Sequence, residues 1–174
     1  RLPSAPRFRP PLCERLPARP GAHARPLLPR DEVAVLPAGH ALAAQAVLQV
    51  QDFANQPFVS LSADDPYRRQ IDARFAEAGV ARQLHLQTHS AVAVCAMVQQ
   101  GLGLAIVNPL TALAMAGSGL VVRRLGFSVP FSINALLPLY RPALPEAQPL
   151  LQSLEAQAQE VTAALQRLLS QPAN

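Results

Sequence analysis

Residues 88–109, THSAVAVCAMVQQGLGLAIVNP, form the pattern that most restricts what this chain can fold into. Thr88 and Ser90 place side-chain hydroxyls where the first turn of a helix has unpaired N–H groups. The next eight residues, 91–98, are all Ala, Val, Met or Cys. Because no side of such a helix is polar, we expect it to be buried on nearly all sides.

The second half of this segment predicts a turn followed by a buried strand. Gly101 suits the left-handed position that ends a helix, and residues 102–107 are apolar apart from one glycine. A helix that leads into a strand covered on both faces is half of a parallel βαβ unit, which predicts the α/β fold class. In such sheets, ligands bind at helix N-termini and at the carboxyl ends of strands, here residues 88–90 and 107–109.

The first 30 residues differ sharply in composition from the rest of the chain. They hold seven Arg, one Glu and eight of the 18 Pro residues, a net charge of +6. Subtracting them from the 15 basic and 11 acidic residues leaves eight and ten, so the basic character comes from this Arg/Pro-rich head. A segment so rich in Pro sustains neither helix nor ladder hydrogen bonds, and we expect disorder. Three interpretations stay open: a solvated tail, a basic arm that contacts DNA, and a segment that is not native coding sequence.

From residue 32 onward, apolar runs and turn residues alternate. Asp65 and Pro66 suit the cap and the first position of a helix that Gly79 ends. From residue 58 the order is strand, helix, strand, helix, strand, and right-handed crossovers would make this sheet mostly parallel. Strands are expected at 32–36, 58–61, 84–86, 102–107, 120–125 and 132–140, and helices at 66–78, 91–99 and 145–169.

No motif supports catalysis, a metal site or a bound cofactor. The four histidines lack metal-ligand spacing. Gly101 and Gly103 follow a helix and precede a strand, which is the reverse of a nucleotide-binding loop. Asp64 and Asp65 are predicted to cap a helix rather than to act as an acid–base pair. We therefore expect a protein that is not an enzyme and needs no cofactor or metal.

Cysteine usage and hydropathy bear on the compartment. Cys95 lies within the apolar helix and Cys13 in the Pro-rich head, so a disulfide between them is not expected. No apolar run reaches the length of a membrane span, and the head lacks the apolar core of a secretory signal. We expect a cytoplasmic protein with no membrane contact.

Short polar side chains gather at the ends of the predicted elements. Each one alone is more simply explained as a helix cap or a loop residue. Together they lie at the edge where α/β sheets bind ligands. Hydroxyl groups and a helix N-terminus suit a carboxylate or another small polar anion. The candidate residues are Ser60, Ser62, Tyr67, Arg68, Thr88, His89, Ser90 and Asn108.

An ordered set of segments resembles a known family. VLPAGHALA, DFANQPFVSL, RRQIDARFAEAG and the segment 88–109 resemble the effector-binding region of LysR-type transcriptional regulators. Within that family, the resemblance is strongest to members that regulate amino-acid or opine catabolism. It runs from about residue 32 to the C-terminal helix.

The resemblance implies a fold and a place for the ligand. It implies a type 2 periplasmic-binding-protein-like domain of two α/β subdomains, which hold a small effector between them. By this resemblance, residues 41–125 are the second subdomain and residues 130–174 return to the first. It also places effector-binding residues at 59–62 and 88–90, which adds Val59 and Leu61 to the candidates.

The chain also departs from the family pattern. The family's DNA-binding helix-turn-helix, its dimer-forming helix and the first half of the first subdomain have no counterpart here, and residues 1–30 resemble none of them. We therefore expect residues 31–174 to be a partial, truncated effector-binding domain that senses a small polar metabolite of amino-acid or carboxylate type. DNA would be contacted only through the missing helix-turn-helix, and the full-length protein would be a homo-oligomer. The alternative is a fragment of a solute-binding protein for transport, which has the same fold.

Overall fold

The computed structural model describes residues 12–13, 21–117, 119–140 and 145–170. The contacts divide the chain into two compact units. The larger unit contains Arg30–Pro130 together with the described residues from Val161 onward. The smaller unit contains the described residues up to Pro29 together with Phe131–Glu160. Whether these units are the family's two subdomains stays a prediction.

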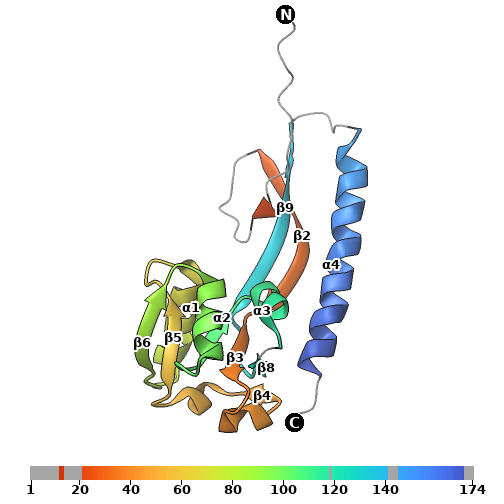
Figure 1. Cartoon of the computed structure of the whole chain (residues 1–174). Coiled ribbons are helices and arrows are strands. Elements are labelled where there is room, and N and C mark those ends of the chain that lie inside the picture. The colour runs from red at the N-terminus through yellow and green to blue at the C-terminus, as the bar shows by residue number, and fades with distance from the viewer. Residues whose placement is uncertain (1–11, 14–20, 118, 141–144, 171–174) are drawn as a thin grey trace, which may run out of the picture. The chain divides into compact units, whose positions relative to one another are not determined.

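Strands and helices alternate through the larger unit, as the apolar pattern predicts (Figure 1). Over the described residues of both units, the strands are β1 (Leu12–Cys13), β2 (Ala22–Asp31), β3 (Val33–Pro37), β4 (Val47–Leu48), β5 (Pro57–Leu61), β6 (Gln83–Thr88), β7 (Ala105–Val107), β8 (Leu120–Leu125) and β9 (Pro130–Pro138). The helices are α1 (Pro66–Glu77), α2 (Ala91–Gln99), α3 (Pro109–Met115) and α4 (Ala147–Leu169), with short 3-10 helices η1 (Ala41–Ala44) and η2 (Val50–Phe53).

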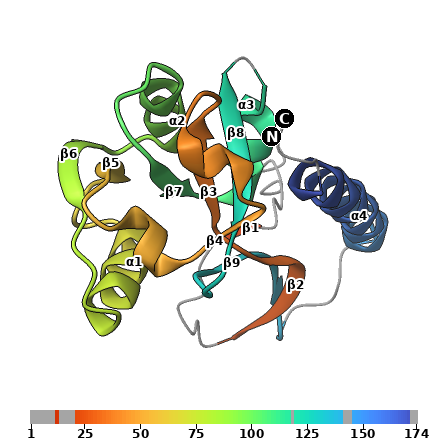
Figure 2. The same ribbon diagram turned by 90° about the horizontal axis from the view of Figure 1, so that it is seen from below.

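Strands of the larger unit join into one sheet. Four strands pair in the order β4-β8-β3-β7, and β5 pairs with β6 in parallel. A parallel bridge between Phe58 and Leu104 connects the two groups, because the Val59 N–H donates to the Leu104 carbonyl oxygen at 2.9 Å. The strands β6, β5 and β7 therefore run parallel and lie side by side (Figure 2).

The parallel arrangement predicted from residue 58 onward is found in these three strands, whereas β3, which precedes that segment, has the opposite direction. This strand pairs antiparallel with both β7 and β8. It follows neither neighbour directly in the chain, so the crossover rule does not set its direction. In addition, the sequence of a fully buried strand does not indicate whether it pairs parallel or antiparallel, because both of its faces are apolar.

Two apolar clusters lie on the two faces of this sheet. Successive strand residues alternate between them: Val59 belongs to the first cluster and Phe58 to the second. The first cluster contains residues of α2 and α3, and the second contains Ile71 and Phe75 of α1. Helices therefore cover both faces, as expected for an α/β sheet.

The prediction that α2 is buried on nearly all sides is wrong. Val94, Cys95 and Val98 are fully buried, but Val92 is 54% exposed and Ala96 is also exposed. Small apolar residues do not mark which side of a helix faces the core, because Ala and Val are tolerated on the surface.

The prediction of disorder for residues 1–30 is wrong for Ala22–Arg30, which belong to β2. In the smaller unit's sheet, the strand order is β1-β9-β2. Pro26 and Pro29 are exposed on β2, which lies at one end of that order. Proline is tolerated on an edge strand because its missing N–H can face solvent. Residues 1–11 and 14–20 of the predicted head lie outside the described residues.

One glycine allows β5 and β7 to approach. Gly103 has φ +146°, and a Cβ atom there would lie 2.6 Å from the Pro57 carbonyl oxygen. The neighbouring Leu104 N–H donates to that same oxygen at 2.8 Å. By contrast, Gly101 has φ +78° and nothing within 4 Å of the corresponding position.

We predict that Gly103→Ala lowers the free energy of unfolding by about 3 kcal/mol, because backbone strain adds to a clash with backbone atoms. The matched control Gly101→Ala should cost about 1 kcal/mol, since only the left-handed conformation is penalised there. Urea denaturation of both variants measures the difference. Equal losses would show that Gly103 does not limit the approach of the strands.

A second prediction concerns the buried thiol of Cys95. Burial raises the pKa of Cys95 from its ordinary value to about 11, so little reactive thiolate exists at pH 8. In a Cys13→Ser variant, Cys95 should react with a thiol reagent only as fast as the protein unfolds, and at once in denaturant. Rapid labelling of the native protein at pH 8 would contradict this burial.

Candidate functional site

The carboxyl ends of β6, β5 and β7 lie at one edge of the larger unit's sheet. Because the three strands are parallel and adjacent, the residues that follow them emerge side by side. These residues are Ser62 after β5, His89 and Ser90 after β6, and Asn108 after β7. Four of the predicted binding residues therefore come together at this edge, which we call the carboxyl edge.

Backbone hydrogen bonds fix the ends of β5 and β6 relative to each other. In the ladder, Ser60 is opposite Gln87 and Leu61 is opposite Thr88. Beyond the last pair, the Ser62 N–H donates to the Thr88 carbonyl oxygen at 3.0 Å. Leu61 and Ser62 thus lie beside Thr88, the last residue of β6.

A helix begins directly after each of the three strands. Asp65 caps α1, where its Oδ1 accepts from the Tyr67 N–H at 2.8 Å and from the Arg68 N–H at 3.1 Å. The Ser90 Oγ accepts from the Ala93 N–H at the start of α2. The Asn108 Oδ1 accepts from the Thr111 N–H at the start of α3. The positive ends of three helix dipoles therefore lie at the carboxyl edge.

The predicted residues differ in how they are exposed. Val59 is fully buried in the first apolar cluster, so its side chain contributes packing rather than a polar contact. Ser60 and Tyr67 are also buried, whereas His89 and Ser90 are exposed. The half-buried residues are Leu61, Ser62, Thr88 and Asn108.

Two exposed side chains approach each other across the carboxyl edge. His89 Nδ1 lies 4.0 Å from Asp64 Oδ1, and the side chains are 82% and 75% exposed. The pair is ionic only when the imidazole is protonated, and at this exposure it contributes little to stability. It does show that the loops before α1 and α2 meet.

Sequence reasoning missed a charged cluster, buried on its cationic side, that reaches the end of β5 through Arg68. Arg68 was expected only as a polar residue at a helix start, yet it is 5% exposed and donates to the Leu61 carbonyl oxygen at 2.9 Å. Asp72 accepts hydrogen bonds from both Arg68 and Arg82. Burial lowers the pKa of Arg82 from its ordinary value, and the hydrogen bond to Asp72 opposes that shift. The i,i+4 spacing of Arg68 and Asp72 was the one signal in the sequence.

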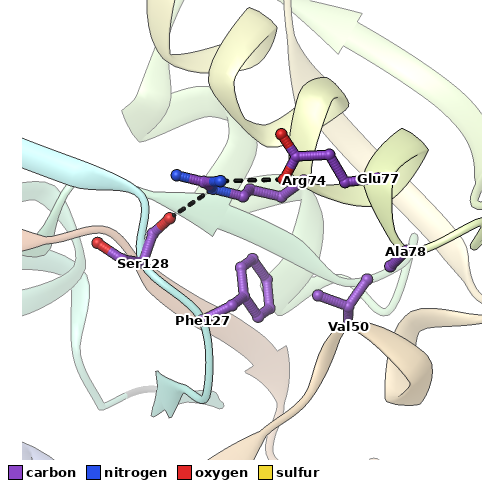
Figure 3. Close-up of a pocket in the computed structure, with 6 residues that line it drawn as sticks. All are labelled: Val50, Arg74, Glu77, Ala78, Phe127 and Ser128. Carbon is purple, nitrogen blue, oxygen red and sulfur yellow. Dashed lines mark hydrogen bonds and ion pairs between the residues drawn. The ribbon is translucent and has the colours of Figure 1, made fainter.

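An open pocket of about 480 Å³ lies at the other end of α1 (Figure 3). The guanidinium of Arg74 lines this pocket. It donates to the Ser128 carbonyl oxygen and to the Glu77 carboxylate, each at 3.0 Å. The carboxyl edge, by contrast, gathers the hydroxyl groups of Ser62, Thr88 and Ser90, the imidazole of His89 and the amide of Asn108. The pocket is lined by Val50, Arg74, Glu77, Ala78, Phe127 and Ser128.

The part of the chain that the structure describes contains neither a metal-binding cluster nor a membrane-spanning helix. No group of three or more His, Cys, Asp or Glu side chains there is arranged to hold a metal ion. No helix in residues 21–117, 119–140 or 145–170 is long and apolar enough to cross a bilayer.

The cap of α1 predicts different effects on stability for the neighbouring residues Asp65 and Asp64. Asp65→Ala should lower the free energy of unfolding by about 1 kcal/mol, because the first turn of α1 loses its acceptor. The matched control Asp64→Ala should change it by less than about 0.5 kcal/mol, as for other surface residues. Thermal or urea denaturation measures both. A larger loss for Asp64 would mean that the two carboxylates have been assigned the wrong roles.

Comparison with known proteins identifies the family. A model described as the LysR substrate binding domain matches residues 8–159. The transcriptional activator protein LysR of Escherichia coli is 44% identical over 159 residues, which are 91% of this chain and 51% of that protein. The regulatory protein NocR of Agrobacterium tumefaciens is 28% identical over 71% of this chain and 41% of that protein. The chain thus spans about half the length of the curated relatives it matches.

The family match also corrects an expectation about the head. It begins at residue 8, so the expectation that residues 1–30 resemble no part of the family is wrong for most of them. The bias toward Arg and Pro in these residues hid the resemblance.

Solved structures agree on the fold. The CcmR regulatory domain from Synechocystis PCC6803 matches with a TM-score of 0.70 at 17% identity, over 84% of this chain and 72% of that chain. An OxyR variant from Corynebacterium glutamicum matches with a TM-score of 0.71 at 17% identity, over 90% of this chain and 50% of that chain. The predicted type 2 periplasmic-binding-protein-like α/β fold is confirmed. The chain belongs to the LysR family, of which it contains the substrate-binding domain.

Proposed function

We propose that this domain senses a small polar metabolite, of amino-acid or carboxylate type, at the carboxyl edge of β6, β5 and β7. Binding of this effector would control transcription by the regulator to which the domain belongs. The observation that carries the proposal is the convergence of three helix N-termini and several hydroxyl groups on one sheet edge. The proposal assigns the domain no catalytic role.

The chemistry of the edge favours an anionic group on the ligand. The first turn of a helix has more N–H donors than its cap can satisfy, and its dipole attracts negative charge. The side chains of Ser62, Thr88 and Ser90 add hydroxyl groups that can donate or accept. A carboxylate accepts several such hydrogen bonds at once.

The relatives support the same reading. The curated ones are a transcriptional activator and a regulatory protein, which favours a regulator over a solute-binding protein for transport. Among the structural relatives, the QuiR effector-binding domain was solved with shikimate and the CcmR domain with 2-PG. Both are small polar ligands.

The remaining parts of the proposal concern the whole regulator. DNA would be contacted through a helix-turn-helix outside these residues, and the regulator would act as a homo-oligomer. Because its relatives control transcription in bacteria, we place it in the cytoplasm.

The proposal predicts a ligand-dependent gain in thermal stability. Amino acids, opines and small carboxylates would be screened by differential scanning fluorimetry. A true effector should stabilise the native domain by RT ln(1 + [L]/Kd), about 2.7 kcal/mol at 100-fold excess over Kd. Changing Ser60→Ala together with His89→Ala should abolish most of this shift, because Ser60 is the penultimate residue of β5 and His89 directly follows β6.

A control variant also replaces one histidine and one serine by alanine, but at positions away from the carboxyl edge. His85→Ala together with Ser153→Ala removes an exposed imidazole from the body of β6 and an exposed hydroxyl from α4. This variant should show the full ligand-dependent shift. The proposal is wrong if the Ser60/His89 variant keeps the same shift for every compound that stabilises the unchanged protein.

A further inference from the structure

One planar guanidinium connects the end of β5 to α1. Arg68 Nη1 donates to the Leu61 carbonyl oxygen at 2.9 Å. The same side chain donates through Nε to both carboxylate oxygens of Asp72, each at 2.8 Å. Since the Arg68 N–H is also held by the α1 cap, both ends of this residue are fixed.

A second guanidinium fixes Asp72 from the segment before β6. Arg82 Nη2 donates to Asp72 Oδ1. Its guanidinium carbon lies 4.7 Å from the ring centre of Phe58 and 4.2 Å from that of Phe75. Stacking on two aromatic rings stabilises a cation that has lost its water. Arg82 therefore pairs with the same carboxylate as Arg68.

The cluster is buried on its cationic side. The Arg68 and Arg82 side chains are each 6% exposed, whereas Asp72 is 41% exposed. Two buried cations share one carboxylate, and burying a charge is costly unless it is paired. Replacing such buried ion pairs by apolar residues is often neutral or stabilising, so stability alone does not account for this cluster.

We propose that Arg68 is a positioning residue for the carboxyl edge, which holds the Leu61 backbone and thereby Ser60 and Ser62 in the geometry that binds the effector. This inference rests on the proposed function for its ligand. Its structural part, the fixing of the end of β5, stands independently of any ligand. Asp72 acts on the edge only through Arg68.

Lysine cannot replace arginine in this role. An arginine fork reaches Leu61 and both oxygens of Asp72 at once, whereas the ammonium of lysine is a point charge without that geometry. Arg68→Lys therefore keeps the charge and removes the connection between β5 and α1. Arg82→Lys is the matched control, because it makes the same change in the same cluster at a residue that does not contact Leu61.

The first measurement is amide hydrogen exchange without ligand. The Ser62 N–H, directly after Leu61, donates to the Thr88 carbonyl oxygen, whereas the Val59 N–H, in the middle of β5, donates to the Leu104 carbonyl oxygen. We expect Arg68→Lys to increase the exchange rate of Ser62 relative to Val59 by about tenfold, corresponding to one lost charge-assisted hydrogen bond. Arg82→Lys should change this ratio by less than about threefold. Equal ratios in the two variants would overturn the inference.

The second measurement is the Kd for the compound that gives the largest thermal shift. Arg68→Lys should weaken binding about tenfold, and Arg82→Lys much less, even where both lower the melting midpoint similarly. Equal weakening by both variants would show a merely structural role. If the unchanged protein binds no compound, the proposed function fails, while the exchange ratio still decides whether Arg68 positions the strand.

A further variant keeps the test decisive if Arg68→Lys does not fold. Asp72→Asn keeps the volume of a half-exposed side chain and removes the charge that orients Arg68. It should raise the Ser62 exchange ratio and weaken binding more than Arg82→Lys does. A larger effect of Arg82→Lys than of Asp72→Asn on the Ser62 exchange ratio and on Kd would overturn the inference.

Discussion

The backbone pairing of β5 with both β6 and β7 is the constraint on which the candidate site depends. It makes three strands parallel and places their carboxyl ends at one edge. The approach of β7 to β5 requires a residue without Cβ at Gly103. Because each strand leads directly into a helix, the same pairing brings three helix N-termini together. The polarity of the edge thus follows from backbone geometry before any side chain is considered.

The local signals in the sequence predicted the elements of the larger unit well. The Asp65-Pro66 start and the Gly79 stop predict a helix at 66–78, and α1 runs from Pro66 to Glu77. Cap and turn residues act within a few positions, so one sequence contains their information. For the same reason, the caps at Ser90 and Asn108 and their place at the carboxyl edge could be predicted.

What could not be predicted depends on distant partners. The antiparallel direction of β3 and the strand in the Arg/Pro-rich head depend on which strands lie beside them. The bond between Arg82 and Asp72 spans ten residues, and the Arg82 side chain also stacks on Phe58. No periodicity links these residues, so a buried cluster next to the predicted site went unseen. Because of this cluster, the end of β5 is fixed by Arg68, which is itself paired with Asp72, and not by the helix caps alone.

The most direct test of the account is NMR mapping of the ligand site. The compound with the largest thermal shift would be titrated into the labelled protein, and amide chemical shifts followed. If the effector binds at the carboxyl edge, the largest changes fall at Ser60–Ser62, at residues 88–90 and at Asn108. Changes concentrated instead at Val50, Arg74 and Phe127 would place the ligand in the pocket at the other end of α1 and contradict the account.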